Sequence, residues 1–184
     1  MKTTIILILS SVFLISCVHL SAGDQSFYLS VSGGANLERL RPNLFVNNPE
    51  INVGAFGGIA GGYHFNVSNR VELELSYRYT KSHDLNYSNS LTTAIINYYY
   101  HLPLKYRFKP YLGFGLGYSH RYLTFNIEKF VPTTVDEGKF ATQWIVGIGG
   151  EAGCNREIGI EYRYLDADNI FEDHSIGIKL TQHF

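Results

Sequence analysis

The chain has 184 residues, with 18 Gly and 14 Tyr but only one Met and one Trp, and its formal net charge is −1. This length suits a single domain, and the composition favours strands over helices. A near-neutral charge without a basic cluster gives no basis for a nucleic-acid partner. After the N-terminal 22 residues, no apolar run reaches the roughly 18 residues that a spanning helix needs. Any membrane crossing must therefore be made by strands.

The first element in the chain is an N-terminal segment with the layout of a secretory signal. Lys2 gives a positive start, an apolar core covers 5–15, and small residues follow up to Ala22. We expect residues 1–22 to be a signal peptide that is removed, which leaves one domain over 23–184. A second route stays open, because "LISC" ends at Cys17 and is similar to a bacterial lipobox, in which Cys17 would be lipidated.

Eight stretches of alternating apolar and polar residues follow. Side chains two positions apart share one face of a strand, so this alternation predicts amphipathic strands. In "RVELELSYRYT", for example, Leu73 and Leu75 share one face while Glu72 and Glu74 share the other. The predicted strands cover 27–37, 51–65, 70–80, 92–102, 110–122, 140–151, 157–164 and 175–184.

The connections between these strands are sorted by length. Short links, "NVSN", "PLKYRFK" and "GCNR", follow the second, fourth and sixth strands. Long links follow the first, third, fifth and seventh strands, at 38–50, 81–91, 123–139 and 166–173. Long links at one end and short links at the other predict an all-β fold, an eight-stranded antiparallel up-and-down barrel with one elaborated end.

Alternation alone does not decide which face of the barrel is outside. A soluble lipocalin-like barrel turns its apolar face inward, whereas a transmembrane β-barrel turns it outward. Tyrosines near the ends of the apolar faces, a last strand that runs to Phe184, and balanced charges on the polar face favour the transmembrane form. These charges predict an interior network, because ions in a narrow lumen need partners. Its expected members are Glu72, Glu74, Arg78, Arg121, Glu151, Glu161, Arg163 and Lys179.

The end of the chain resembles a known sorting signal. In "SIGIKLTQHF", Ile176, Ile178 and Leu180 alternate up to Phe184, a pattern similar to the C-terminal assembly signal of Gram-negative outer-membrane proteins. Gln182 departs from it, since an apolar or aromatic residue is usual there. "FKPYLGFGLGYS" and "IGIEYRYL" resemble strands of the small OmpA-like and opacity-type surface barrels. The resemblance implies a bacterial outer-membrane location, with outer-membrane lipid, lipopolysaccharide and the barrel-assembly machinery as partners.

The lumen of an eight-stranded barrel is about wide enough for side chains to fill. We therefore expect function to lie in the four long links, as a structural or adhesin-like surface antigen that binds a host surface, a protein or lipopolysaccharide. A small porin or ligand-transport barrel is one alternative, and a lipid A-modifying enzyme is another.

The sequence predicts no catalytic, cofactor or metal site. Adjacent Ser119 and His120 should point to opposite faces of a strand, and His83 with Ser88 matches no hydrolase motif. The seven histidines lack the spacing of metal ligands. The acidic stretch "DADNIFED" lacks the glycine and the ligand order of a calcium loop.

Overall fold

The structure is a computed structural model that describes residues 27–40, 51–82, 87–104, 106–125, 133–153, 155–167 and 171–184. The expected signal peptide, 1–22, and the candidate lipidation site Cys17 lie outside these residues. Both therefore stay predictions.

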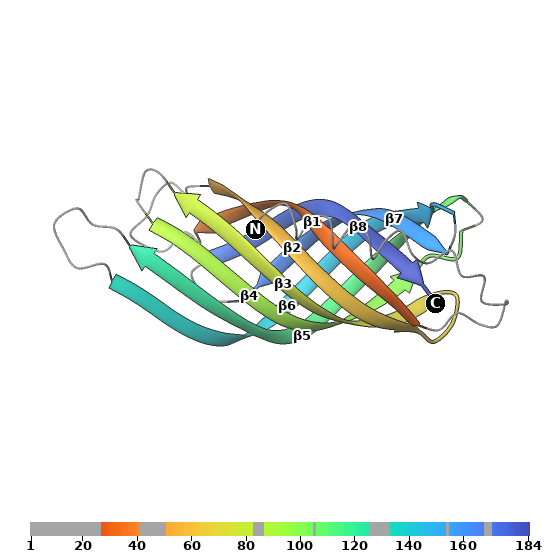
Figure 1. The fold of residues 1–184 in the computed structure, drawn as a ribbon, viewed down its shortest axis with the longest axis horizontal. Helices are drawn as coiled ribbons and strands as arrows, with labels where there is room; N and C mark the ends of the chain where they lie inside the picture. Colours follow the sequence, from red (N-terminus) through yellow and green to blue (C-terminus); the bar gives the residue numbers. More distant parts are fainter. Residues whose placement is uncertain are drawn as a thin grey trace, which may run out of the picture.

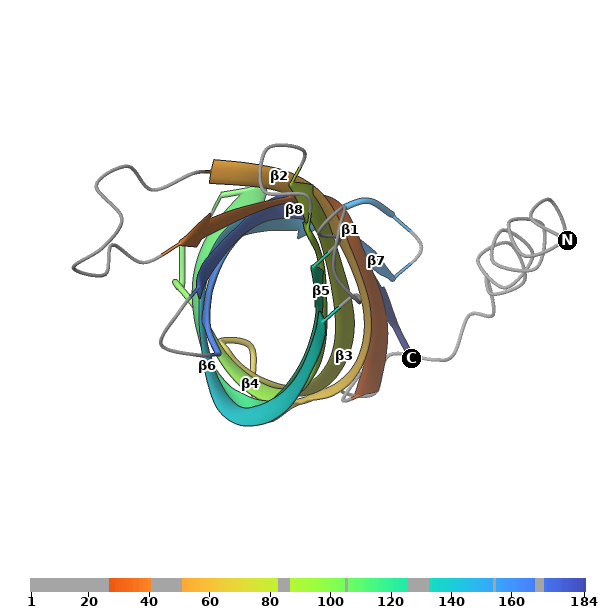
Figure 2. The same cartoon turned by 90° about the vertical axis from the view of Figure 1, so that its left-hand side faces the viewer.

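Eight antiparallel strands close into one barrel, in which each strand pairs with its neighbours in sequence and β1 pairs with β8 (Figures 1 and 2). The predicted all-β, eight-stranded up-and-down architecture is confirmed. The strands are β1 Phe27–Leu40, β2 Ile51–His64, β3 Asn69–Ser82, β4 Tyr87–His101, β5 Phe108–Phe125, β6 Thr133–Glu151, β7 Arg156–Asp166 and β8 Phe171–His183.

The strands are staggered around the barrel, as closure of a tilted sheet requires. Paired residues can be followed from Tyr28 on β1 around all the strands, and the path returns to β1 at Glu38 instead of Tyr28. The intermediate partners are Gly62, Glu72, Asn97, Gly115, Gln143, Leu165 and Asp173.

The polar faces of the strands point into the barrel and the apolar faces point out. On β3 the side chains of Glu72 and Glu74 are 0% and 1% exposed, whereas Leu73 and Leu75 are 55% and 51% exposed. A soluble barrel shows the reverse arrangement. The structure thus decides between the two orientations that the sequence pattern left open.

Short turns join the strands at one end, which we call the short-turn end, and the first and last strands also meet there. The connections between strands there cover 65–68, 102–107 and 152–155, within one or two residues of the predicted short links 66–69, 103–109 and 153–156. In the first, the Asn66 side chain accepts hydrogen bonds from the backbone N–H groups of Ser68 and Asn69, both at 2.9 Å. The Phe184 N–H donates to the Phe27 carbonyl at 3.0 Å, which joins β1 to the end of the chain.

At the opposite end, the long-loop end, the strands run farther than predicted. The boundaries 38–50, 81–91, 123–139 and 166–173 were wrong, since β1 continues to Leu40, β5 to Phe125, and β6 begins at Thr133. Polar residues that point into the barrel continue the strands in this region. Glu38, Asn89 and Asp173 are all buried, and Asn89 donates a hydrogen bond to Glu38. A strand that is polar on its inner face and exposed to water on its outer face lacks the apolar alternation that identifies strands in sequence.

Some strand pairs approach so closely that only glycine fits. A Cβ on Gly117 would lie 2.1 Å from the Ala94 carbonyl oxygen, whereas a Cβ on Gly57 meets nothing nearer than 3.9 Å. We expect Gly117→Ala to lower the free energy of unfolding by about 1–3 kcal/mol through overpacking, and Gly57→Ala to be nearly neutral. Urea unfolding in detergent micelles, followed by the fluorescence of the single Trp144, measures both. Equal effects of the two substitutions would contradict the close approach at Gly117.

Candidate functional site

A network of ion pairs, here called the central network, occupies the middle of the lumen. Lys179 Nζ donates to both carboxylate oxygens of Glu72, at 2.8 and 2.6 Å. Arg163 donates to Glu74 at 2.7 Å and also to Glu161. All five side chains are at most 3% exposed. Because β3 and β7 lie on opposite sides of the eight-stranded ring, the Arg163–Glu74 pair crosses the full lumen.

Neutral side chains add hydrogen bonds to the central network. Tyr111 donates from its hydroxyl to Glu161 at 2.8 Å, and Tyr99 donates to Glu72 at 3.2 Å. Buried carboxylates are tolerated only when their charge is paired and their oxygens are bonded. These carboxylates meet that condition, so their burial in the lumen is compatible with a stable fold.

A second group, the rim network, lies nearer the long-loop end. Arg121 forms ion pairs with Asp173 at 3.0 Å and with Glu38 at 3.3 Å. Its guanidinium also lies over the ring of Phe171, 4.6 Å from the centroid. Asn36 donates to Asp173 at 3.1 Å. These contacts join β1, β5 and β8 across the part of the lumen near the long-loop end.

Arg78 lies in the lumen with neutral partners. It donates to Gln143 and Ser76, both at 3.1 Å, and no carboxylate of the described residues lies within ion-pair distance of it. Among the described residues named above, the central and rim networks each hold one carboxylate more than they hold cations. The positive charge of Arg78 therefore offsets part of this excess.

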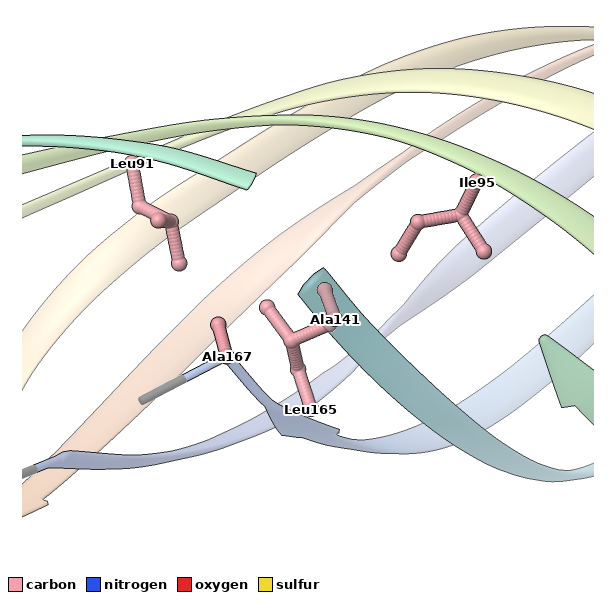
Figure 3. Close-up of a cluster of buried hydrophobic side chains, with 5 residues drawn as sticks. All are labelled: Leu91, Ile95, Ala141, Leu165 and Ala167. Atoms are coloured by element: carbon pink, nitrogen blue, oxygen red, sulfur yellow. The ribbon is translucent and has the colours of Figure 1, made fainter. Parts of the chain in front are cut away.

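Apolar side chains fill another part of the lumen. Figure 3 shows a cluster of inward-pointing residues from β4, β6 and the end of β7. Its members are Leu91, Ile95, Ala141, Leu165 and Ala167. Bonds between strands that are not neighbours, together with this packing, occupy the space that a wide aqueous channel would need.

The structure places every predicted member of the interior network inside the barrel except Glu151, which is exposed. Glu151 was a wrong assignment. It has the same alternation as the inner residues of β6, but it is the last residue of that strand, so its side chain lies beyond the end of the barrel. The prediction missed Glu38 and Asp173, which were placed in loops. It also missed Arg70, whose ion pair with Glu157 spans 3.4 Å. A continued two-residue period from Glu72 and Glu161 would have found this last pair.

Of the residues considered for catalysis, Ser119 and His120 point to opposite faces of β5, as predicted. Ser119 is buried, whereas His120 is exposed on the outer face of β5. His83 lies outside the described residues. Within the part of the chain that the structure describes, no group of three or more His, Cys, Asp or Glu side chains is arranged to hold a metal ion.

The outer surface of the barrel is an apolar belt with aromatic side chains toward both ends. Ile176, Ile178, Leu180 and Phe184, the residues of the expected assembly signal, are 38–56% exposed. Exposed aromatic residues lie toward the short-turn end at Tyr98, Tyr100, Tyr106 and Phe108, and toward the long-loop end at Tyr77, Tyr79, Tyr118 and Tyr122. An apolar band between two aromatic girdles is the surface of a barrel that spans a bilayer.

A family model described as "Outer membrane protein beta-barrel domain" matches residues 10–184. The chain belongs to this family. Its place is accordingly the bacterial outer membrane, and its apolar belt contacts lipid. No helix in the described residues is long and apolar enough to cross a membrane.

Curated relatives occur in Brucella. Uncharacterized proteins of Brucella abortus and Brucella suis are each 30% identical to the chain over 145 residues, which cover 61% of this chain and 51% of the relative. The chain thus spans about half the length of the curated relatives that it matches.

Solved outer-membrane barrels share the fold at low sequence identity. Neisserial surface protein A superposes with a TM-score of 0.64 at 16% identity, covering 86% of this chain and 97% of the other. Ail, the attachment invasion locus protein of Yersinia pestis, gives 0.56 at 14% identity, covering 85% and 99%. OprG of Pseudomonas aeruginosa gives 0.53 at 11% identity, covering 86% and 97%. At these identities the likeness shows the fold alone.

The lipid contact of the belt predicts the effect of a charge placed on it. Leu75 is 51% exposed in the middle of β3. Leu75→Arg should lower the free energy of unfolding by about 2–4 kcal/mol, the cost of arginine near the bilayer midplane. Val67→Arg is the control, because Val67 is 88% exposed in a turn beyond the belt. Urea unfolding in lipid vesicles measures both, and a similar small effect at both positions would contradict the lipid contact.

Proposed function

We propose that the protein is an outer-membrane surface protein, structural or adhesin-like, that acts through the segments at its long-loop end. The observation that carries this proposal is the set of bonds across the lumen, from Arg163 to Glu74 and from Arg121 to Asp173. These bonds keep the lumen closed to solutes. The protein therefore acts through the segments at the ends of the barrel and not through a channel.

The proposed orientation follows the rule that outer-membrane barrels have short periplasmic turns and longer extracellular loops. The short-turn end then faces the periplasm. The segments 41–50, 83–86, 126–132 and 168–170 join strands at the outer end. Because β5 and β6 have 18 and 19 residues, and a strand needs only about 9–11 to span a bilayer, both extend beyond the membrane and would present their connecting segment to the surroundings.

An adhesin-like role is supported by the shared fold with Ail, an attachment invasion locus protein. Ail has also been solved in complex with the heparin analogue sucrose octasulfate. The candidate partners of this chain are a host-surface molecule, a protein or lipopolysaccharide, and the barrel-assembly machinery would recognise Ile176, Ile178, Leu180 and Phe184.

The role of the surface segments is tested by replacing 41–50 and 126–132 with Gly-Ser segments of the same lengths. Cells that express the intact protein should adhere to cultured host cells, and cells that express the variant should not. Val67→Ser, at the opposite end, is the control. The shift in gel mobility on boiling must be the same for all three proteins, which shows that each barrel is folded. Undiminished adhesion by the replaced variant would contradict a role for these two segments.

The lipid A-modifying alternative has its own readout. Under the surface-protein proposal, the mass of lipid A should be the same in cells with and without the protein. A mass change that disappears with Ser88→Ala or His83→Ala would favour an enzyme.

A further inference from the structure

A cavity of about 870 Å³ opens at the short-turn end and has no part in the surface function. We call it the turn-end pocket. Residues from all three short turns and from the end of β8 line it. Its volume falls in the range of roughly 300–1,000 Å³ that is usual for small-molecule sites. The polar residues used below are His64, His101, Arg107, Lys109, Arg156 and His183.

Two histidines in the pocket wall have buried ring nitrogens that form no hydrogen bond with any residue that the structure describes. Nε2 of His64 and Nδ1 of His101 are both without a hydrogen-bond partner. The His101 side chain is only 8% exposed, and its ring packs against Tyr111 with centroids 5.0 Å apart. A polar atom that is buried and unbonded costs about 1–3 kcal/mol. A ligand that enters the pocket can remove this cost.

The charges around the pocket favour an anion. Arg107, Lys109 and Arg156 belong to its lining, against the carboxylates of Glu151 and Glu157. Glu157 is already engaged by other groups, because it lies 3.4 Å from Arg70 and 3.7 Å from His183.

Arg70 adds a further positive charge inside the lumen, next to the lining residue Glu157. Its side chain is fully buried, and its Nε and Nη2 atoms have no hydrogen-bond partner. The guanidinium is held among the rings of Tyr28, Tyr99 and Tyr111, at 5.4, 4.6 and 5.2 Å from their centroids. The guanidinium is therefore fixed in place, and its Nε and Nη2 N–H groups remain available as donors.

We propose that the turn-end pocket binds a phosphate-bearing ligand. A phosphate group offers several acceptor oxygens in different directions, which suits imidazole donors from β2 and β4 together with guanidinium and ammonium donors from β5 and the neighbouring turns. Two sources share this chemistry. Phe65 and Val67 are 62% and 88% exposed beside the pocket, so a phospholipid headgroup can reach it from the adjacent leaflet, and free phosphate can enter from the aqueous side.

The test uses the full-length barrel, labelled on its histidine nitrogens and refolded in a non-ionic detergent. Titration with inorganic phosphate should shift the signals of His64, His101 and His183 and leave His120, which lies toward the other end of the barrel, unchanged. The double variant Arg107→Gln/Lys109→Gln should bind phosphate at least about tenfold more weakly, because it loses two charged donors. His101→Phe keeps a ring against Tyr111 but removes the ring nitrogens, and should also weaken binding. Lys81→Gln, an exposed change at the long-loop end, is the matched control and should bind like the original protein.

Repeating the titration in nanodiscs of phosphatidylglycerol distinguishes the two sources. If a headgroup fills the pocket, the three histidine signals are already shifted before phosphate is added, and phosphate changes them little. If free phosphate is the ligand, they match the detergent spectrum until phosphate is added. Histidine signals that move in neither medium would overturn the proposal. Binding by the double variant that equals binding by Lys81→Gln would overturn it as well.

Discussion

Arg163→Met should lower the free energy of unfolding by about 3–5 kcal/mol, because removing one partner of a buried ion pair leaves an uncompensated charge. Arg163 bonds to both Glu74 and Glu161, so two carboxylates lose their cation at once. Urea unfolding in detergent micelles, followed by Trp144 fluorescence, measures the loss. Arg39→Met is the matched control, since Arg39 is exposed on the outer face of β1 and its loss should cost less than about 1 kcal/mol.

If Arg163→Met and Arg39→Met gave the same loss, the central network would not stabilise the barrel. The apolar cluster around Leu165 would then be the main support of the closed lumen.

Lys179→Met should have an effect of similar size, about 3–5 kcal/mol, because it leaves Glu72 buried without its cation. A second substitution, at Glu72, separates the Lys179–Glu72 interaction energy from the other effects of losing Lys179. In the double variant Lys179→Met/Glu72→Gln the stranded charge is gone, so this protein should be more stable than Lys179→Met alone. A double-mutant cycle with the same urea assay gives the interaction energy directly. Strictly additive effects would mean that Lys179 and Glu72 do not stabilise each other.

Much of the barrel could be predicted because a strand has a side-chain period of two and this chain keeps it for most of its length. In "RVELELSYRYT" the positions of Glu72, Glu74 and Arg78 identify the polar face of the strand, which in the structure is the buried one. The choice between lipid and water outside needed other features, since the same alternation fits both kinds of barrel. The expected signal peptide, the sorted links and the last strand up to Phe184 supplied them.

The missed parts of the site have one physical origin. Beyond the membrane the outer face of a strand meets water and no longer has to be apolar, so Glu38 and Asp173 were assigned to loops. The sequence of a single strand also does not indicate which residues it meets across the lumen. That Arg163 meets Glu74 depends on the stagger of the closed sheet. That Glu151 is exposed depends on where β6 ends.

The turn-end pocket could not be found from the sequence for a related reason. His64, His101 and His183 lie far apart in the chain and come together only because β2, β4 and β8 end at the same rim. Each one alone has the appearance of a polar residue at the end of a strand.

Single-channel recording of the refolded protein in planar bilayers tests most directly whether the lumen is closed. With Arg163, Lys179 and Arg121 bonded across the lumen, the intact protein should insert without producing discrete conductance steps. Frequent, well-resolved steps from the intact protein would contradict the closed barrel and would favour a small porin or transport barrel instead.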